Sequence, residues 1–580
     1  MPHYRNHVSR TFSFTLLLLL VSIVIGTALR FGNLTLKSPW TDEFATMVFS
    51  LGNSYQTVPL NQAISLDTLL EPLKPNPAAG ASAVLRHLFD EDHHPPLYFL
   101  LAHWWTQLFP PVGNYVSLWA MRSLPALLGV ASIPAVYGLS WLAFRSQLVA
   151  QLAAAMMAVS PYGIFLAQEA RHYSLGILWI IASLSCLVVA LQHLKHQKPL
   201  PLPVALSWIV VNSLGMATHY FFSLTLCAEA MVLIGFWVLR KIRKTSFSPQ
   251  WLRIGSVAAG TFFGCLVWLP VWQASREPEM IQWMISSNGN IWTIVNPIFQ
   301  SFAAWITMLF LLPVEVSARL VWIISGLVML LFFIWVVPIL YRGIKTQLKQ
   351  SDTSLATGIL GGFVCGAIAL FFSITYLLGI DLTRGARYNF VYFPAVIVLV
   401  GAALAISWQP DWEIGRLGGK ATVAIIWLMG FLSSLTVINN LGYQKYYRPD
   451  LLVSMMQQQS SVPVLIATTH NSLVQTGEMM GIAWELKHAI NSPALPINPQ
   501  FLLAHQEQEQ CVSLSIPGKN CPAFTTLQQA LAQLPRPLDL WLVNFKASVG
   551  ELPTCFAQET TQSPISVDGY TTQLYHCGRW

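Results

Sequence analysis

The sequence predicts a mainly α-helical protein that crosses a membrane many times and ends in a small α/β domain. Three observations favour this class. Of the 580 residues, 54% are hydrophobic and only 10% are charged, whereas an average soluble chain carries about 25% charged residues. Long apolar stretches recur up to about residue 440, and a more polar tail follows them. This composition excludes a set of ordinary soluble domains and a disordered chain.

About eleven stretches are long and apolar enough to cross a hydrocarbon layer of roughly 30 Å, which takes about 20 helical residues. The first resembles a signal peptide, but no clean cleavage site follows it, so we expect a retained anchor. The stretches lie near residues 11–30, 117–143, 148–166, 173–192, 203–220, 221–239, 251–273, 319–340, 356–380, 389–408 and 421–440.

Two further apolar runs, Pro95–Phe109 and Ser301–Leu312, are too short to cross. Runs of this length are typical of interfacial helices. A crossing at Pro95–Phe109 would also move the basic run that begins at Arg240 to the outer side, against the positive-inside rule. We therefore expect both runs to lie along the outer membrane face.

The basic residues sort by side of the membrane. With the N-terminus in the cytoplasm, cytoplasmic segments hold 15 Lys and Arg residues and three acidic residues. Such an excess is typical of cytoplasmic loops. The formal net charge of +7 therefore indicates orientation, and we expect no nucleic-acid partner because the basic residues form no single binding face.

The tail contains strand-like runs at Val462–Ala467 and Leu538–Phe545 and a helical stretch at Leu527–Leu534, which together predict a small external α/β domain. No Walker or GxGxxG pattern occurs, so we expect no nucleotide cofactor and no ATPase-driven transport. The predicted organisation is a transmembrane domain over 1–440, which includes a large first external loop over 31–110, and an external domain over 441–580.

The eight cysteines agree with this orientation. Four fall in predicted spans, where cysteine is an ordinary small apolar residue, and four fall in the external tail, where an even number favours two disulfides. Metal binding by the tail is the weaker alternative, because no CxxC or His–Cys spacing occurs. Connectivity is open; the pairs we expect are Cys511–Cys521 and Cys555–Cys577, and the cysteines in spans are Cys186, Cys227, Cys265 and Cys365.

Polar clusters follow the predicted spans at the outer face. Asp42 and Glu43 come about ten residues after the first span; the alternative is that Thr41 or Asp42 caps a helix over Glu43–Leu51. His93 and His94 follow three acids and precede Pro95-Pro96, where a charged start of a helix explains the acids better than the histidines.

A third cluster, Ser160–Tyr173, lies at the outer end of the third span, and Glu169 and Arg171 within it are costly at a membrane edge unless they are used. Two smaller clusters, Thr218–Tyr220 and Asp381–Tyr388, reach the same face. Each cluster alone is compatible with simple interface anchoring. Because anchors would be shared between both faces, five clusters on one face predict a functional site there.

These motifs resemble the polytopic glycosyltransferases of the GT-C class, over roughly residues 10–440. The similarity is greatest to the group that includes protein O-mannosyltransferases, aminoarabinose transferases of lipid A and galacturonosyltransferases of lipopolysaccharide core, the family 39-like enzymes. The tail matches no domain that we can name. The resemblance is carried by Asp42-Glu43, His94-Pro95-Pro96, Gln168-Glu169-Ala170-Arg171-His172-Tyr173 and the late Arg387-Tyr388 followed by Pro394.

The resemblance implies a GT-C-like bundle with interfacial helices in the first external loop. It also implies an enzyme that moves a hexose or pentose from a polyprenyl-phosphate carrier to an acceptor hydroxyl on a glycan, lipid or protein, with inversion, at the outer face of a bacterial plasma membrane. By the family's pattern Asp42 is the general base and Glu43 supports it. Glu169 is a second carboxylate that positions Asp42 or a divalent cation.

The departing phosphate requires cationic donors, for which the resemblance implies three arginines and two tyrosines; five further residues would position the substrates. Metal use varies within the class, and the candidate ligands are Asp42, Glu169 and His94. The phosphate-binding candidates are Arg171, Arg384, Arg387, Tyr173 and Tyr388, and the positioning candidates are His93, His94, His172, His219 and Tyr220.

Two alternatives share many of these features. A polytopic transporter or lipid flippase explains the spans, but it would require polar residues at the bilayer midplane. An envelope-polysaccharide ligase or polymerase would share the lipid-phosphate donor. Glu229, in the middle of a span, is either hydrogen-bonded inside the bundle or part of a proton relay.

Overall fold

The computed structural model describes residues 2–242, 250–268, 271, 283–285, 291–409, 413–414, 417–490, 498–506, 521–550, 552, 554–557 and 565–578. It divides into two compact units. The first comprises Met1–Leu36, Asp92–Leu101 and Arg122–Tyr443; the second comprises Lys37–Glu91, Ala102–Met121 and Gln444–Trp580. Most of the first external loop therefore belongs to the same unit as the tail, an association that the sequence did not predict.

The first unit is a bundle of apolar helices at the eleven places predicted for spans. Within the described residues, seven helices are long and apolar enough to cross a membrane: α1 (Pro2–Phe31), α6 (Leu118–Phe144), α9 (Tyr173–Lys195), α11 (Phe222–Ile242), α16 (Arg319–Lys349), α17 (Ser354–Leu377) and α19 (Gly419–Ile438). The bent pair α7 (Gln147–Ala158) and α8 (Pro161–Ala167) can form an eighth span. The shorter apolar helices are α10 (Leu202–Thr218), α12 (Trp251–Leu266) and α18 (Phe393–Ser407).

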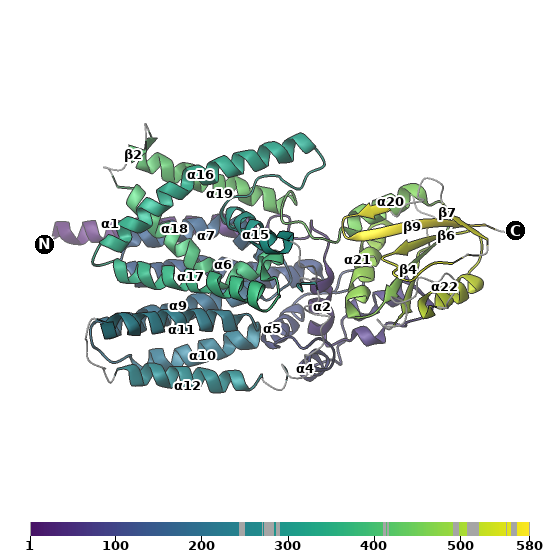
Figure 1. Cartoon of the computed structure of the whole chain (residues 1–580), viewed down its shortest axis with the longest axis horizontal. Coiled ribbons are helices and arrows are strands. Elements are labelled where there is room, and N and C mark those ends of the chain that lie inside the picture. Colours follow the sequence, from purple (N-terminus) through teal and green to yellow (C-terminus); the bar gives the residue numbers. More distant parts are fainter. Residues whose placement is uncertain are drawn as a thin grey trace. The chain divides into compact units, whose positions relative to one another are not determined.

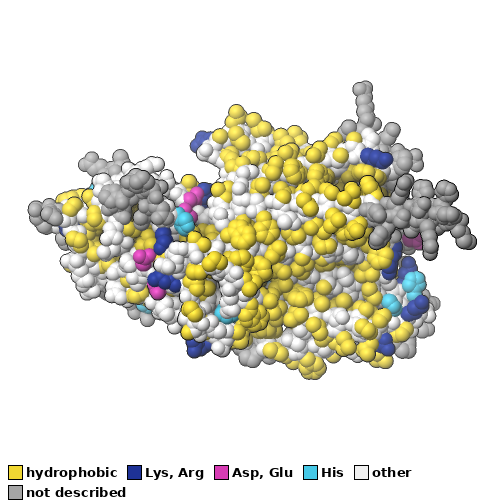
Figure 2. Space-filling view, turned by 180° about the vertical axis from the view of Figure 1, so that it is seen from behind, with side chains coloured by type: hydrophobic (Ala, Val, Ile, Leu, Met, Phe, Trp, Pro, Cys, Tyr) yellow, Lys and Arg dark blue, Asp and Glu magenta, His cyan; other side chains and the backbone are white. Residues whose placement is uncertain are grey.

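Neighbouring helices of this unit pack along their length; Figure 1 shows α9, α10, α11 and α12 side by side. Large apolar side chains such as Leu16, Ile234 and Leu331 are exposed on the bundle. Figure 2 shows hydrophobic side chains over the helices as a broad band, with Lys, Arg and His gathered at its edges. The predicted multi-pass α-helical membrane protein is confirmed.

The break between α7 and α8 bends the chain by 56°. Pro161 begins α8 and Ser160 caps it by accepting a hydrogen bond from the Gly163 N–H, because proline suits the first helical position but cannot continue the preceding helix. The carbonyl groups released at the break are bound by two polar side chains. Arg30 donates to the carbonyls of Met157 (2.9 Å) and Ala158 (3.1 Å), and Ser434 donates to the carbonyl of Val159 (2.8 Å).

The first short run forms helix α5 (Leu97–Thr106), whereas the second, predicted over Ser301–Leu312, supplies only the end of a longer helix, α15 (Ile291–Leu309). Neither is among the helices of the described chain that are long and apolar enough to span. Ten residues of α5 extend about 15 Å, half of a hydrocarbon layer. Short 3₁₀ helices η4 (Leu382–Arg384) and η5 (Ala386–Val391) precede α18, and a two-stranded sheet, β2 (Glu413–Ile414) and β3 (Leu417–Gly418), precedes α19.

The second unit contains a seven-stranded sheet with the strand order β1-β5-β4-β6-β9-β7, and β8 pairs with β9. The central strands β5, β4 and β6 are parallel, and crossover helices α21 and α22 connect them. The strands are β1 (Ala63–Ser65), β4 (Val464–His470), β5 (Gln500–His505), β6 (Leu538–Val543), β7 (Cys555–Ala557), β8 (Ile565–Val567) and β9 (Tyr570–Cys577). The helices are α2 (Thr41–Ser50), α3 (Leu66–Leu69), α4 (Ala81–His87), α20 (Pro449–Gln459), α21 (Leu473–Ile490) and α22 (Pro522–Gln533), with short turns η1 (Tyr55–Thr57), η2 (Glu71–Leu73) and η3 (Leu88–Asp92).

The burial of apolar side chains on both faces explains why these strands form the centre of the sheet. Leu465 and Ala467 of β4 share a core with Leu527 of α22, while α21 contacts the same strand and lies on the other side of the sheet in Figure 1. A strand covered on both faces is continuously apolar, and the first residues of β4 fit this rule. The predicted α/β domain is confirmed, and strand β1 of the first loop extends it antiparallel to β5, with Ile64 opposite Phe501.

The Cys555–Cys577 disulfide, which is the expected pair, joins β7 to β9. Cys521 is disulfide-bonded, and Cys511 lies outside the described residues. The four cysteines in helices of the first unit are free thiols.

Candidate functional site

Four of the five polar clusters belong to the first unit and meet at one end of its helices. Residues 92–94 precede α5, residues 168–173 connect α8 to α9, residues 219–220 connect α10 to α11, and residues 381–388 connect α17 to α18. Side chains from the four clusters contact one another. The fifth cluster, Asp42-Glu43, belongs to the second unit.

Asp92 and His94 contact each other beside Arg171. His94 Nδ1 lies 2.8 Å from Asp92 Oδ2, and its Nε2 lies 3.5 Å from Arg171 Nη2. Burial raises the pKa of the Asp92 carboxyl, but the charge and hydrogen bond of His94, together with the charges of Arg171 and His93, outweigh burial and lower it overall. Asp92 is therefore a carboxylate at neutral pH, able to orient His94 toward Arg171.

His172 and His219 form a buried pair. Their ring centroids are 4.4 Å apart, and the His172 side chain also approaches the rings of His94 (6.0 Å) and Tyr98 (6.1 Å). Burial lowers the pKa of both histidines well below 6.5, and the positive charges of Arg171 and Arg387 lower it further. Both rings are therefore neutral at pH 7.

The two histidines differ in their hydrogen bonds. His219 Nδ1 accepts the backbone N–H of Phe221 at 2.9 Å, so its Nε2 carries the proton when the ring is neutral. His172 is 1% exposed, and both of its ring nitrogens are without a hydrogen-bond partner among the described residues. Because buried polar groups normally have partners, this ring is suited to bind a substrate.

Tyrosines fix the surrounding loops. The hydroxyl of Tyr220 donates to the carbonyl of His93 at 2.9 Å, where the backbone of His93 is left-handed with φ of 60°. Tyr173 is 1% exposed, and its ring packs against those of His219 (5.7 Å) and Phe390 (5.5 Å). The predicted positioning residues therefore belong to one packed cluster.

The segment 381–388 brings two arginines to aromatic rings. The guanidinium of Arg387 lies 5.4 Å from the ring of Trp283 and 5.3 Å from that of Tyr388. Arg384 pairs with Asp381 (3.3 Å) and donates to the Trp283 carbonyl at 2.7 Å. Arg384 thus holds Trp283 beside Arg387, and stacking leaves the guanidinium edge of Arg387 suitable for an oxyanion.

Glu169 and its neighbour Gln168 are buried in the turn between α8 and α9, with 3% and 4% exposure. The carbonyl of Glu169 accepts the Arg171 N–H at 2.7 Å. The Gln168 amide donates to the carbonyl of Gly32 at 2.8 Å, just after α1. The turn that carries Arg171 and His172 is therefore tied to the end of the first helix.

In the second unit, Asp42 and Glu43 occupy the first turn of α2. The N-cap is Trp40, whose side chain makes no cap hydrogen bond, so the interpretation of Thr41 or Asp42 as the cap is wrong. Acidic residues are favourable there because the helix N-terminus carries a partial positive charge. Glu43 is fully buried, whereas Asp42 is partly exposed.

Helix α2 is held by the tail. The ring of Phe44 packs edge-on against that of Trp484 in α21 at 6.2 Å. A Cβ atom on Gly477 of α21 would lie 2.8 Å from Thr41 Cγ2, so the glycine permits the close approach. Lys445 Nζ lies 4.1 Å from the ring of Trp40. No pattern in the sequence indicated that the tail carries this helix.

Among the described residues, no group of three or more His, Cys, Asp or Glu side chains is placed to hold a metal ion. The metal candidates Asp42, Glu169 and His94 thus form no such group. Glu229 is 3% exposed in α11, and its Oε2 accepts the Ser183 hydroxyl at 3.0 Å. This carboxyl is hydrogen-bonded inside the bundle, in a network that includes Trp208, Asn212 and Thr261.

Sequence reasoning missed three contributors to this region. Trp283 and Phe390 supply rings to the cluster, and Asp92 supplies its carboxylate partner to His94. Phe390 and Asp92 stand next to residues that were singled out, so their position in the sequence was an available signal. Trp283 stands in a stretch without any such pattern.

No family model matches this sequence, and no curated protein matches it. Among solved structures, ArnT from Cupriavidus metallidurans bound to undecaprenyl phosphate is 10% identical over 97% of this chain and 98% of that chain, with a TM-score of 0.46. The apo form of the same ArnT is 9% identical over 98% of this chain and 98% of that chain, with a TM-score of 0.47. The oligosaccharyltransferase of Archaeoglobus fulgidus in complex with Zn and sulfate is 16% identical over 76% of this chain and 55% of that one, with a TM-score of 0.41.

Proposed function

We propose that this protein is a membrane glycosyltransferase that moves a sugar from a polyprenyl-phosphate carrier to an acceptor hydroxyl at the outer membrane face. The observation that supports the proposal most is the convergence of residues 92–94, 168–173, 219–220 and 381–388, distant in sequence, at one end of the spans. Three of these segments, 92–94, 168–173 and 381–388, carry motifs that resemble the GT-C class. A set of unrelated interface anchors would have no reason to contact one another.

In the proposed reaction, the bond between the sugar C1 and the carrier phosphate breaks as the acceptor oxygen bonds to C1 from the opposite face. The carrier leaves as polyprenyl phosphate. Arg171 and Arg387 stabilise the negative charge on the leaving phosphate, since arginine binds phosphate through two parallel N–H donors. Arg384, paired with Asp381, keeps Trp283 beside Arg387.

Neutral histidines suit the binding of a sugar. The Nε2–H of His219 donates to a hydroxyl oxygen, and His172 offers both an acceptor and a donor nitrogen. Tyr173 and Tyr388 add hydroxyl donors from the same cluster. Because the rings are uncharged, they do not compete with the arginines for the phosphate.

The proton of the acceptor hydroxyl goes to Asp42, the general base, with Glu43 beside it on α2. Glu169 is the second carboxylate, buried in the turn that carries Arg171. The donor sugar is a hexose or a pentose, and assays with donors of both classes distinguish the two. The membrane is the bacterial plasma membrane, with the N-terminus in the cytoplasm.

The test is incubation of the purified full chain with radiolabelled polyprenyl-phosphate sugars and membrane extract. We expect transfer of the label and release of polyprenyl phosphate, and loss of both in the Asp42→Asn and Arg387→Gln variants. Glu71→Gln, which changes an exposed acid of the same loop, is the matched control. Normal turnover by Asp42→Asn would overturn the base assignment.

The same incubation separates the alternatives. A transporter or flippase would move the labelled lipid across vesicle membranes with the glycosyl–phosphate bond intact. A ligase or polymerase would join preassembled glycans into products of high mass. Either result, without transfer of single sugars, would contradict the proposed function.

A further inference from the structure

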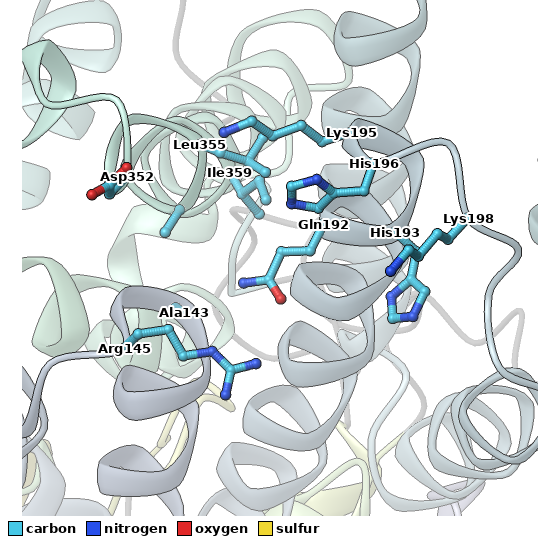
Figure 3. Close-up of a pocket in the computed structure, with 11 residues that line it drawn as sticks. Ala143, Arg145, Gln192, His193, Lys195, His196, Lys198, Asp352, Leu355 and Ile359 are labelled. Carbon is cyan, nitrogen blue, oxygen red and sulfur yellow. The ribbon is translucent and has the colours of Figure 1, made fainter.

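A second polar site lies at the opposite end of the helices of the first unit. A cavity of about 360 Å³ is lined by the C-terminal ends of α6 and α9 and by the first turns of α17. Figure 3 shows Arg145, Gln192 and Lys195 around this space, with Leu355 and Ile359 of α17 on one side. No residue of this cavity belongs to the candidate glycosyltransferase site.

The cavity carries an excess of positive charge. Arg145, Lys195 and Lys198 line it, against a single carboxylate, Asp352. Among the described residues, none of the three cations pairs with a carboxylate; the guanidinium of Arg145 lies over the ring of Trp141 at 5.0 Å. His193 and His196 add two further nitrogen-bearing rings. The site is therefore built for an anion.

Its place along the spans sets its depth in the membrane. Helix α9 runs from Tyr173, next to His172, to Lys195 at the cavity. Its 23 residues extend about 34 Å, close to the thickness of a hydrocarbon layer. The cavity and the candidate active site thus lie at opposite membrane interfaces, and the cavity belongs to the interface that the positive-inside rule places in the cytoplasm.

The wall of the cavity is apolar where α17 begins. Ala356 and Ile359 form this wall together with Leu355, and Ala143 of α6 completes it. Cationic and aliphatic side chains that line the same cavity suit a ligand with a phosphate group attached to an apolar body. A free inorganic anion would have no use for the aliphatic wall.

We propose that this cavity binds the phosphate headgroup of an anionic membrane phospholipid. Basic pockets between spanning helices at the cytoplasmic interface are suited to such headgroups. Arg145, Lys195 and Lys198 contact the phosphate, and the glycerol backbone lies against Leu355 and Ile359. A lipid held there joins α6, α9 and α17, and so stabilises the helices that carry the candidate active site at their other end.

The test uses the purified full chain in neutral detergent. Phosphatidylglycerol, cardiolipin, phosphatidylcholine or inorganic phosphate is added, and retained lipid is measured by native mass spectrometry and stability by thermal unfolding. We expect the two anionic lipids to be retained and to raise the unfolding temperature, and the other two additions to have no effect. Lys195→Gln combined with Lys198→Gln should weaken retention about 25-fold, at about fivefold for each charge removed.

Lys345→Gln combined with Lys349→Gln is the matched control, because it removes two exposed lysines of the neighbouring helix end that do not line the cavity. It should retain lipid as the unmodified chain does. Equal loss in both double variants would show that the charge of the whole face, and not the cavity, attracts the lipid. An equal effect of inorganic phosphate would show that the site takes a free anion. Both results would overturn the proposal, and neither depends on glycosyltransferase activity.

Discussion

The candidate site combines charged residues with buried, neutral histidines. His172 and His219 are kept neutral by burial, and Asp92 is kept ionised by His94 and Arg171 despite its burial. The site therefore holds an ionised carboxylate and neutral histidines close to one another, and the neutral histidines make the stability of the protein depend on pH.

The neutral histidines predict that the protein loses stability in mild acid. An unfolded histidine has a pKa near 6.5, and His172 and His219 have lower values when folded. Below pH 6.5 the unfolded state therefore binds protons that the folded state does not, and the free energy of unfolding falls by up to about 1.4 kcal/mol per pH unit for each histidine. Above pH 6.5 this effect is absent.

Between pH 7 and pH 5, a range that brackets the unfolded histidine pKa of about 6.5, the unfolding temperature of the His172→Gln variant should decline less steeply than that of the unmodified chain. His488→Gln, which changes an exposed histidine of α21, should leave the slope unchanged. An identical slope in His172→Gln would contradict a neutral buried ring.

Several candidate site residues stand out in the sequence because they are polar residues next to apolar stretches. Arg171 and Arg387 follow predicted spans, and His94 precedes the short run Pro95–Phe109. Arg30 was not predicted to act inside the bundle, since an arginine at the end of a span normally marks an interface. Only the structure shows that it is fully buried and turned toward the carbonyls of α7.

At the scale of elements, the break between α7 and α8 positions the turn 168–172. The bend leaves carbonyl groups without helical partners, and Arg30 binds two of them. A buried carbonyl without a partner costs about 1–3 kcal/mol. The Arg30→Met variant should therefore lose about 2–5 kcal/mol of stability.

Thermal unfolding in detergent measures this loss. Arg319→Met, which removes an exposed arginine at the start of α16, is the matched control and should be near neutral. If the two variants were equally stable, the guanidinium of Arg30 would not stabilise the break.

Helix α21 supports the acidic turn of α2 through a small residue. A Cβ atom at Gly477 would meet Thr41 Cγ2 at 2.8 Å, whereas one at Gly481 would meet Phe44 and Pro449 at an ordinary 3.7 Å. Gly477→Ala should therefore destabilise by about 1–3 kcal/mol through overpacking. Gly481→Ala should stabilise by up to about 1 kcal/mol, because alanine favours a helix interior.

The two alanine variants form a matched pair in one helix, compared by thermal unfolding and by the transfer assay. Activity should fall in Gly477→Ala alone, since it displaces the turn that carries Asp42. Equal stability of both variants would mean that α2 and α21 are less closely packed than the structure shows.

For the whole molecule, the spans could be predicted from composition because each is a local property of about 20 residues. The grouping of the first loop with the tail could not. It depends on β1 pairing with β5, with Ile64 opposite Phe501 more than 400 residues later, and a three-residue strand has no periodicity of its own. The doubly wound order β5-β4-β6 was likewise hidden, since strand order is a non-local property.

The number of crossings between residues 112 and 198 decides the topology. Helices α6 and α9 are each long and apolar enough to cross, so the bent pair α7–α8 determines whether these residues lie on opposite sides. If the pair is one span, three crossings separate them. If it is a re-entrant loop, two crossings separate them and both residues lie on the same side.

Cysteine labelling of intact cells resolves this choice. Val112→Cys and Lys198→Cys place an exposed thiol in each segment, and the four free thiols of the described part of the chain lie in helices. With the N-terminus inside and α5 not crossing, a membrane-impermeant maleimide should label Val112→Cys in intact cells and Lys198→Cys only after permeabilisation. Labelling of both in intact cells would make α7–α8 re-entrant. Labelling of Lys198→Cys alone would invert the predicted orientation or make Pro95–Phe109 a crossing segment, and the proposed lipid site would then face outward.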